Sequence, residues 1–256
     1  MSLEGFSVRS FEAPIRSGRQ VSHDVYERGE GPPVVIIQEL PGIGPETLSL
    51  ATRFVEAGFS VALPHLFGPL GKISMLGNMV RVFCMRREFT LLEKHASSPI
   101  VDWLRALCSD IRDRSGARGV ATIGMCLTGN FAISLMADDS VLAGVASQPS
   151  MPLFGSQSAL HMSAKEIDEV RDALDRDGPM MALRFEEDSF CQAEKFAAID
   201  SAFNDHDHQR VRLTTLPGKG HSVLTLDFVD SDGHPTADAL AEVLNYFTEK
   251  LKQSDD

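Results

Sequence analysis

A lone cysteine stands between two glycines at a predicted corner between a strand and a helix. The segment GVATIGM at 119–125 has the continuous apolar pattern of a buried strand, and Cys126 follows it directly. A helix is predicted next, at about 127–138. Flanking glycines such as Gly124 and Gly129 allow a sharp turn that lifts the residue at its apex above the sheet. A thiol placed there, beside the backbone N–H of Leu127, is suited to nucleophilic attack; the alternative is a packed cysteine in an ordinary turn.

A thiol nucleophile needs a base, and the base needs an acid that orients it. After a nucleophile of this kind the acid and then the base follow along the chain, at the ends of later strands. The predicted strand MMALRF at 180–185 runs into Glu186, Glu187 and Asp188, and VRLTTL at 211–216 runs into a glycine-rich loop with His221. The order Cys126, Asp188, His221 therefore predicts a catalytic triad. Three alternatives stay open: Glu186 or Glu187 is the acid, Asp188 only caps the next helix, or His221 is an ordinary loop histidine.

Strands and helices alternate along the chain in a way that can bring these residues together. Apolar runs predict strands near 20–27, 34–37, 59–64, 119–124, 141–147, 180–185 and 211–216. Helical patterns lie between them, at about 45–57, 98–115, 127–138, 163–177, 189–203 and 235–251. We expect one α/β domain over residues 1–256, with a mostly parallel sheet covered on both faces and a helical insertion at about 68–95. Ligands of such sheets gather at the carboxyl ends of the strands.

The composition narrows the classes of function. A net charge of −12 argues against nucleic acid and anionic membrane surfaces as partners. The N-terminal segment lacks a secretory pattern, and no apolar run is long enough to span a membrane, so a cytoplasmic location is expected. None of the four cysteines belongs to a CxxC pair, so no structural zinc site is expected. His206-Asp207-His208 is a weak metal motif, because nothing in the sequence completes the ligand set.

Five segments, in order, resemble the dienelactone hydrolase family, a cysteine branch of the α/β-hydrolases. They are VVIIQELPGIG, FVEAGFSVALPHLFG, TIGMCLTGNFA, LRFEEDSFCQAEKF and LPGKGHS, between about residues 33 and 225. The resemblance implies the α/β-hydrolase fold and hydrolysis of a small ester or lactone through an acyl-enzyme, with no metal or organic cofactor. It also implies roles for individual residues. Cys126 would be the nucleophile, His221 the base and Asp188 the acid that orients it. The Glu39 carboxylate would contact the resting Cys126 thiol, and the N–H groups of Leu40 and Leu127 would form the oxyanion hole.

Glu39 has a physical role in this picture. A carboxylate near the thiol disfavours a second negative charge, so Glu39 would keep the resting thiol neutral and then draw its proton when substrate binds. The alternative is a solvated loop glutamate. Arg81 and Met125 are candidate substrate contacts.

The chain departs from the family pattern in three places. His65 replaces an acid that ties its loop in the family. Thr128 stands in the elbow where the family usually has glycine, and a β-branched residue there demands more room. The dienelactone-processing members have an arginine shortly after the catalytic histidine, where this chain offers Thr225 and Asp227. These differences leave open another carboxylesterase or thioesterase on the same scaffold, or a non-catalytic binding protein. A monomer or small homo-oligomer is expected.

Overall fold

The sheet has eight strands in the order β1-β2-β4-β3-β5-β6-β7-β8, in a computed structural model that describes residues 3–40, 42–71, 98–150, 158–160 and 162–252. The pairs β1–β2 and β2–β4 are antiparallel, and every other neighbouring pair is parallel. The strands are β1 Ser7–Pro14, β2 Gln20–Arg28, β3 Pro33–Ile37, β4 Ser60–Pro64, β5 Val120–Met125, β6 Val141–Ser147, β7 Met180–Phe185 and β8 Val211–Leu216.

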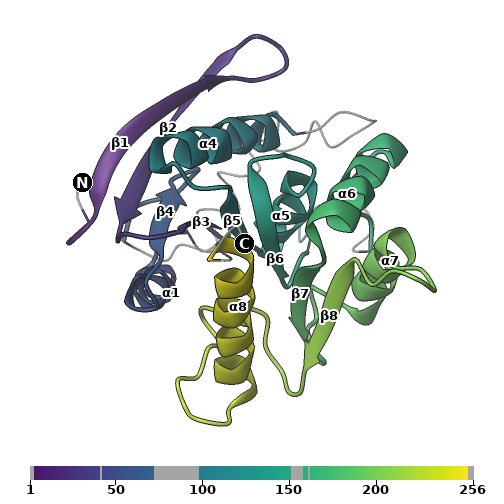
Figure 1. The fold of residues 1–256 in the computed structure, drawn as a ribbon. Coiled ribbons are helices and arrows are strands. Elements are labelled where there is room, and N and C mark those ends of the chain that lie inside the picture. The colour runs from purple at the N-terminus through teal and green to yellow at the C-terminus, as the bar shows by residue number, and fades with distance from the viewer. Residues whose placement is uncertain (1–2, 41, 72–97, 151–157, 161, 253–256) are drawn as a thin grey trace.

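Helices cover both faces of the sheet, as predicted. On one face lie α1 (Pro45–Glu56) and α8 (Pro235–Leu251), and on the other lie α4 (Pro99–Ser115), α5 (Gly129–Leu135), α6 (Ala164–Asp177) and α7 (Ala193–Phe203) (Figure 1). All residues of the central strands β3 and β5 are buried, which explains why their sequences are continuously apolar rather than alternating. Two apolar cores result, one under each layer of helices.

Local sequence signals explain where several helices begin and end. Pro45 opens α1, and Gly58 follows its end with φ +83°, a conformation that favours glycine. The side chain of Ser163 accepts the N–H of Glu166, and the Glu166 carboxylate accepts the Ser163 N–H, so α6 begins with a reciprocal cap.

Three sequence expectations differ from the structure. Strand β1 was not predicted, because its residues are mostly exposed or half-exposed and it depends on pairing with β2. The expected helix at 127–138 is a 3-10 turn at Cys126–Thr128 followed by the shorter α5. The helix expected over 189–203 begins at Ala193, because the preceding residues form a loop. Most of the expected insertion at 68–95 lies outside the described residues.

Candidate active site

The candidate catalytic residues lie at one edge of the sheet. Glu39 follows β3, Cys126 follows β5, Asp188 follows β7 and His221 lies in the loop after β8. These four strands run in the same direction, so their carboxyl ends share an edge.

Cys126 occupies a strained turn between β5 and the 3-10 turn. Its φ is +56°, a left-handed value that non-glycine residues rarely adopt. A Cβ on Gly124 would lie 2.0 Å from the carbonyl oxygen of Thr128, and one on Gly129 would lie 2.9 Å from Cα of Pro149. Glycine is therefore required on both sides of Cys126. Strain of this kind typically costs about 1–3 kcal/mol, and it is found at functional sites.

Thr128 fits the elbow because its hydroxyl takes part in the backbone hydrogen bonding of the turn. Its Oγ1 accepts the N–H of Met125 at 2.9 Å. The same oxygen lies 3.0 Å from the carbonyl oxygen of Met125 and 3.3 Å from that of Ile37, either of which can accept its proton. Thr128 is fully buried, so these bonds replace solvent for its hydroxyl and connect the elbow to the end of β3.

The structure pairs His221 with Asp188. The Nδ1 atom of His221 lies 2.8 Å from Oδ2 and 3.0 Å from Oδ1 of the Asp188 carboxylate. Glu186 and Glu187 are exposed, whereas the Asp188 side chain is completely buried. Asp188 does not cap α7, whose N-cap is Gln192.

Asp188 instead shapes the loop that carries it. Its Oδ1 accepts the N–H groups of Phe190 and Cys191 at 2.8 and 2.9 Å. On the other side, Asp227 holds the His221 loop by accepting the N–H groups of His221 and Ser222 at 2.8 and 2.9 Å. Both ends of the Asp188–His221 pair are therefore fixed by backbone bonds.

The electrostatics of this pair stabilise the imidazolium that forms when the neutral His221 ring takes the Cys126 proton, because a higher pKa makes His221 a stronger proton acceptor. Burial by itself would lower the pKa of His221, but the hydrogen bond to Asp188 and the neighbouring Cys126 raise it to about 10. Burial likewise opposes ionisation of Asp188, yet the bond from His221 and the loop N–H groups hold the pKa of this carboxyl below its ordinary value. The buried Nε2 of His221 makes no hydrogen bond to any described residue and can accept a proton from Cys126.

Glu39 is buried and bonded to two hydroxyl groups. Ser222 donates to its Oε2 at 2.9 Å, and Thr225 donates to its Oε1. Burial raises the pKa of Glu39, although these two hydrogen bonds act in the opposite direction. Glu39 is therefore not a solvated loop residue. Within the described structure its hydrogen bonds go to the His221 loop, and none goes to the Cys126 thiol.

The remaining predicted residues have different positions. Leu40 and Leu127 are buried directly after Glu39 and Cys126, at the ends of the paired strands β3 and β5. The side chain of Met125 is fully buried in the core on the α1 and α8 face. Arg81 lies outside the described residues.

Sequence reasoning missed two residues beside the candidate triad. The hydroxyl of Ser150 lies 3.3 Å from Sγ of Cys126. The ring of Phe190 packs edge-on against the His221 ring, with centroids 5.2 Å apart, although 47% of Phe190 is exposed. No sequence pattern marks Ser150, but the position of Phe190 two residues after the candidate acid was a usable signal.

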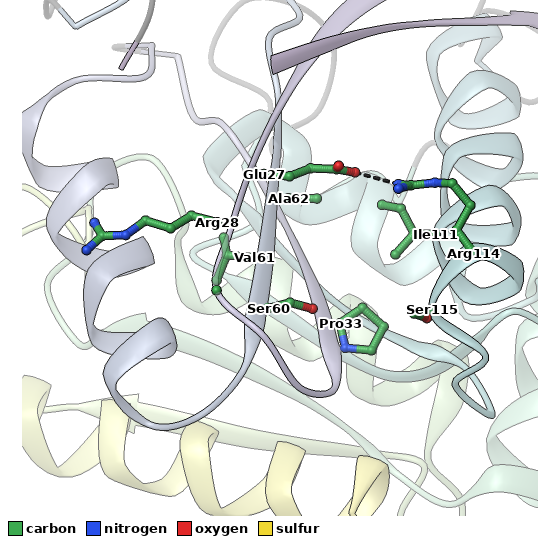
Figure 2. Close-up of a pocket in the computed structure, with 10 residues that line it drawn as sticks. Glu27, Arg28, Pro33, Ser60, Val61, Ala62, Ile111, Arg114 and Ser115 are labelled. Atoms are coloured by element: carbon green, nitrogen blue, oxygen red, sulfur yellow. Dashed lines mark hydrogen bonds and ion pairs between the residues drawn. The ribbon is translucent and has the colours of Figure 1, made fainter. Parts of the chain in front are cut away.

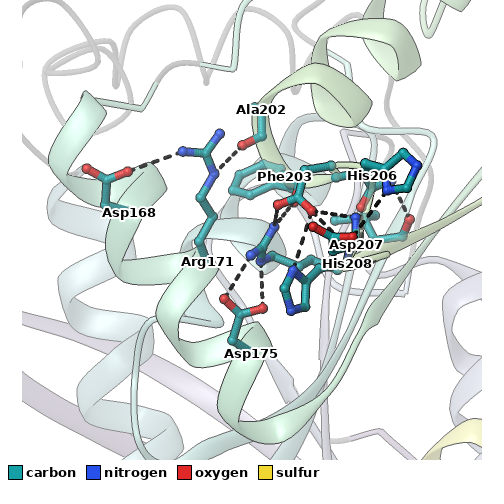
Figure 3. Close-up of polar contacts among 12 residues, drawn as sticks. Asp168, Arg171, Asp175, Ala202, Phe203, His206, Asp207 and His208 are labelled. Atoms are coloured by element: carbon teal, nitrogen blue, oxygen red, sulfur yellow. Dashed lines mark hydrogen bonds and ion pairs between the residues drawn. The ribbon is translucent and has the colours of Figure 1, made fainter.

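The His206-Asp207-His208 segment forms a turn around Asp205. Oδ1 of Asp205 accepts the N–H groups of Asp207 and His208 at 2.9 and 3.0 Å, and Arg210 donates to its Oδ2 at 2.6 Å. Figure 3 shows the side chains of His206, Asp207 and His208 among these polar contacts. The His206 side chain is fully exposed. Across the described ranges, no cluster of three or more His, Cys, Asp or Glu side chains has the arrangement of a metal site.

A separate cavity of about 200 Å³ lies at the opposite edge of the sheet. Its lining includes Pro33 and Ser60, which begin β3 and β4, together with Glu27 and Arg114, which form an ion pair (Figure 2). None of the candidate catalytic residues lines it.

Comparison with known proteins identifies the family. The family model described as dienelactone hydrolase family matches residues 23–251. The chain belongs to the dienelactone hydrolase family. It is thus a hydrolase that acts on ester bonds, and the predicted family and α/β-hydrolase fold are confirmed. The comparison with curated proteins found no match.

Solved structures share the fold of this dienelactone hydrolase family member at low sequence identity. A dienelactone hydrolase-like promiscuous phosphotriesterase from metagenomic libraries is 16% identical, with a TM-score of 0.63 over 95% of this chain and 99% of that chain. A cold-adapted esterase from an Arctic intertidal metagenomic library is 14% identical, with a TM-score of 0.61 over 98% and 97%. An esterase from Pyrococcus furiosus is 12% identical, with a TM-score of 0.60 over 96% and 93%.

Among the described helices, none has the length and apolarity to cross a membrane.

Proposed function

We propose that this protein hydrolyses an uncharged ester or lactone of a small molecule by nucleophilic attack of the Cys126 thiolate, through an acyl-enzyme. The observation that supports the proposal most is the placement of three residues at one edge of the sheet. Cys126 has φ +56° in a strand-to-helix turn there, and the hydrogen-bonded pair Asp188–His221 lies at the same edge. This arrangement presents a nucleophile and an oriented base at the same edge.

The proposed reaction gives each of these residues a role. The thiol proton passes from Sγ of Cys126 to Nε2 of His221, while Asp188 stabilises the resulting imidazolium through Nδ1. The sulfur attacks the substrate carbonyl carbon, and the N–H groups of Leu40 and Leu127 bind the developing oxyanion. The imidazolium returns its proton to the leaving alkoxide, which departs and leaves a thioester on Cys126. Water, deprotonated by His221, then attacks the thioester and releases the acid.

The contacts of Thr225 favour an uncharged substrate. It stands in the stretch after His221 where dienelactone-processing relatives have an arginine for a substrate carboxylate. Here that stretch supplies a neutral hydroxyl, which is bonded to the Glu39 carboxylate. At this position of the described structure, a substrate carboxylate would therefore meet a buried acidic group rather than a guanidinium.

The exposed ring of Phe190 favours an apolar leaving group. It packs against His221, which delivers the proton to the leaving oxygen, so the group attached to that oxygen lies near the ring. An aromatic contact typically contributes about 0.5–1.5 kcal/mol beyond its buried area.

The test is turnover of a panel that contains dienelactone, p-nitrophenyl esters of short and long acids, and acyl thioesters. We expect the neutral aryl esters to be the best substrates and Cys126→Ala to abolish their turnover. Turnover that survives in Cys126→Ala, or no turnover of any ester by the wild type, would contradict the proposal. A preference for dienelactone would contradict the uncharged substrate class alone.

A further inference from the structure

Ser150 is fixed to the elbow by three separate contacts. Its N–H donates to the carbonyl oxygen of Cys126 at 3.1 Å, and its own carbonyl oxygen accepts the Nδ2 group of Asn130 at 3.1 Å. Its hydroxyl oxygen lies 3.3 Å from Sγ of Cys126. Ser150 is completely buried, so solvent does not compete for its hydroxyl.

A buried lysine determines how Asn130 is oriented. The ammonium group of Lys195 donates to Oδ1 of Asn130 and to the carbonyl oxygen of Ala159, both at 2.7 Å. An ammonium group has only donors, so it requires the oxygen of the amide to face it. The amide nitrogen must then face the carbonyl oxygens of Leu127 and Ser150, at 3.3 and 3.1 Å. Lys195 thus prevents a flip of the Asn130 amide that would exchange its oxygen and nitrogen.

Burial of the Lys195 ammonium group costs free energy, which its hydrogen bonds offset. Only 1% of this residue is exposed, and burial lowers its pKa to about 8. An apolar side chain would fill this part of α7 without that penalty. Lys195 lies in the first turn of α7, just after the loop of Asp188, and its side chain reaches Asn130 on α5. It therefore connects the acid loop to the elbow.

We propose that Ser150 is a further catalytic residue whose hydroxyl donates a hydrogen bond to the Cys126 thiolate, and that Asn130 and Lys195 are positioning residues that hold Ser150 there. The proposal rests on the function proposed above, in which Cys126 is the nucleophile. While the thiol is neutral, either atom of the pair can donate. When the Sγ–H bond breaks and the proton moves to Nε2 of His221, sulfur becomes an acceptor only, so the Ser150 hydroxyl must donate. A hydrogen bond to an ionised group is stronger than a neutral one, so Ser150 favours the thiolate.

The readout is the rate of Cys126 alkylation by iodoacetamide as a function of pH. Loss of the donor in Ser150→Ala is expected to move the midpoint of this profile up by about one pH unit. A thiolate without this bond is also more nucleophilic, by about threefold for a unit shift. Ser150→Ala is therefore expected to react about threefold more slowly than wild type at pH 7 and about threefold faster on the alkaline plateau. A structural defect would not produce this crossing of the two profiles.

Matched variants separate the contributions. Ser147→Ala removes another buried serine hydroxyl, one that bonds to Gln148 rather than to Cys126, and is expected to keep the wild-type profile. The other titratable groups described around the elbow are His221, Asp188, Cys191, Glu39 and Lys195, and none of them is changed in Ser150→Ala or Ser147→Ala. Mass spectrometry of the labelled peptides, with Cys126→Ala as the blank, assigns the reaction to Cys126.

Two changes at Lys195 test its positioning role. Lys195→Met removes both the charge and the donor and is expected to shift the profile in the same direction as Ser150→Ala. Lys195→Gln removes the charge but keeps a donor for Asn130, so it is expected to stay closer to wild type. Equal shifts in both variants would mean that the charge matters and would overturn the positioning role.

Ser150→Ala alone decides whether Ser150 is catalytic, because it removes only a hydroxyl group, whereas the Lys195 variants replace a whole side chain. A profile identical to that of wild type would overturn this role while leaving Cys126 as the nucleophile. Failure of Cys126→Ala to abolish turnover would instead reject the underlying function.

Discussion

The hydroxyl group of Thr225 donates a hydrogen bond to the carboxylate of Glu39, although the two residues are 186 positions apart in the chain. This bond connects the end of β3 to the loop that carries His221. It also directs one oxygen of Glu39 toward that loop, and Ser222 does the same for the other oxygen at 2.9 Å. The position of Glu39 is therefore defined by the His221 loop.

Replacement of Glu39 by glutamine tests whether its charge controls the thiol. The negative charge disfavours the thiolate, so Glu39→Gln is expected to raise the rate of Cys126 alkylation at pH 7 by about threefold or more. Turnover is expected to fall about tenfold, since an amide cannot accept from both hydroxyl groups that connect Glu39 to the loop of the base His221. Glu187→Gln, at an exposed position in the loop before Asp188, is the control and should change neither rate. If Glu39→Gln matches wild type in both rates, Glu39 has no role toward Cys126.

The pair His221–Asp188 makes stability depend on pH in a defined direction. The pKa of His221 is raised to about 10 from an ordinary 6.5, so its contribution is complete below about pH 6.5 and is lost as the pH rises through about 10. The pKa of Asp188 is lowered, so its contribution is present above the ordinary 3.8 and is lost as the pH falls through the folded value. The difference in Tm between wild type and Asp188→Asn should therefore be greatest at about pH 5–6 and shrink toward pH 10.

Thermal unfolding of both proteins between pH 5 and 10.5 measures this difference, with the exposed Asp232→Asn as control. A difference in Tm that stays constant from pH 6.5 to 10 would refute the coupling.

The order of the elements was predictable where burial is reflected directly in residue type. The run Val34–Ile37 lies in β3, which is buried on both faces, and the amphipathic pattern of 163–177 corresponds to α6. Strand β1 could not be found in this way, because Ala13 is its only fully buried residue and its pairing with β2 decides its structure.

The grouping of the candidate residues was predictable where topology alone brings them to one edge of the sheet. Asp188 and His221 follow parallel strands, whose carboxyl ends must share an edge. Lys195 was not predictable, because a lysine in a helix normally faces solvent. Its partner Asn130 is 65 residues away, and only the packing of α7 near α5 brings the two together.

Thr128 contributes to stability through its hydroxyl. Thr128→Val keeps the shape of the side chain but leaves the buried N–H of Met125 without its bond. Loss of such a partner costs about 1–3 kcal/mol. Urea denaturation should show this decrease in the free energy of unfolding, whereas Thr248→Val, at an exposed hydroxyl on α8, should change it by less than about 0.5 kcal/mol. Equal effects of the two variants would show that the Thr128 bonds are not important.

Phe190 should affect the alcohol part of the substrate more than the acid part. Phe190→Ala is expected to lower kcat/KM for phenyl acetate by about two- to tenfold relative to ethyl acetate, because the aryl leaving group loses its aromatic contact. Val8→Ala, an exposed apolar residue on β1, is the control. Equal losses for the two acetates would place Phe190 outside the leaving-group site.

The central claim is that Cys126 forms the acyl-enzyme, and rapid quenching of a reaction with p-nitrophenyl acetate tests it most directly. Acid-quenched samples are digested, and the acetylated peptide is located by mass spectrometry while p-nitrophenol release is followed. We predict a burst of p-nitrophenol and an acetyl group on Cys126 that disappears as turnover proceeds, with neither in Cys126→Ala. Turnover without an acetyl group on Cys126, or with the acetyl group on another residue, would contradict the mechanism.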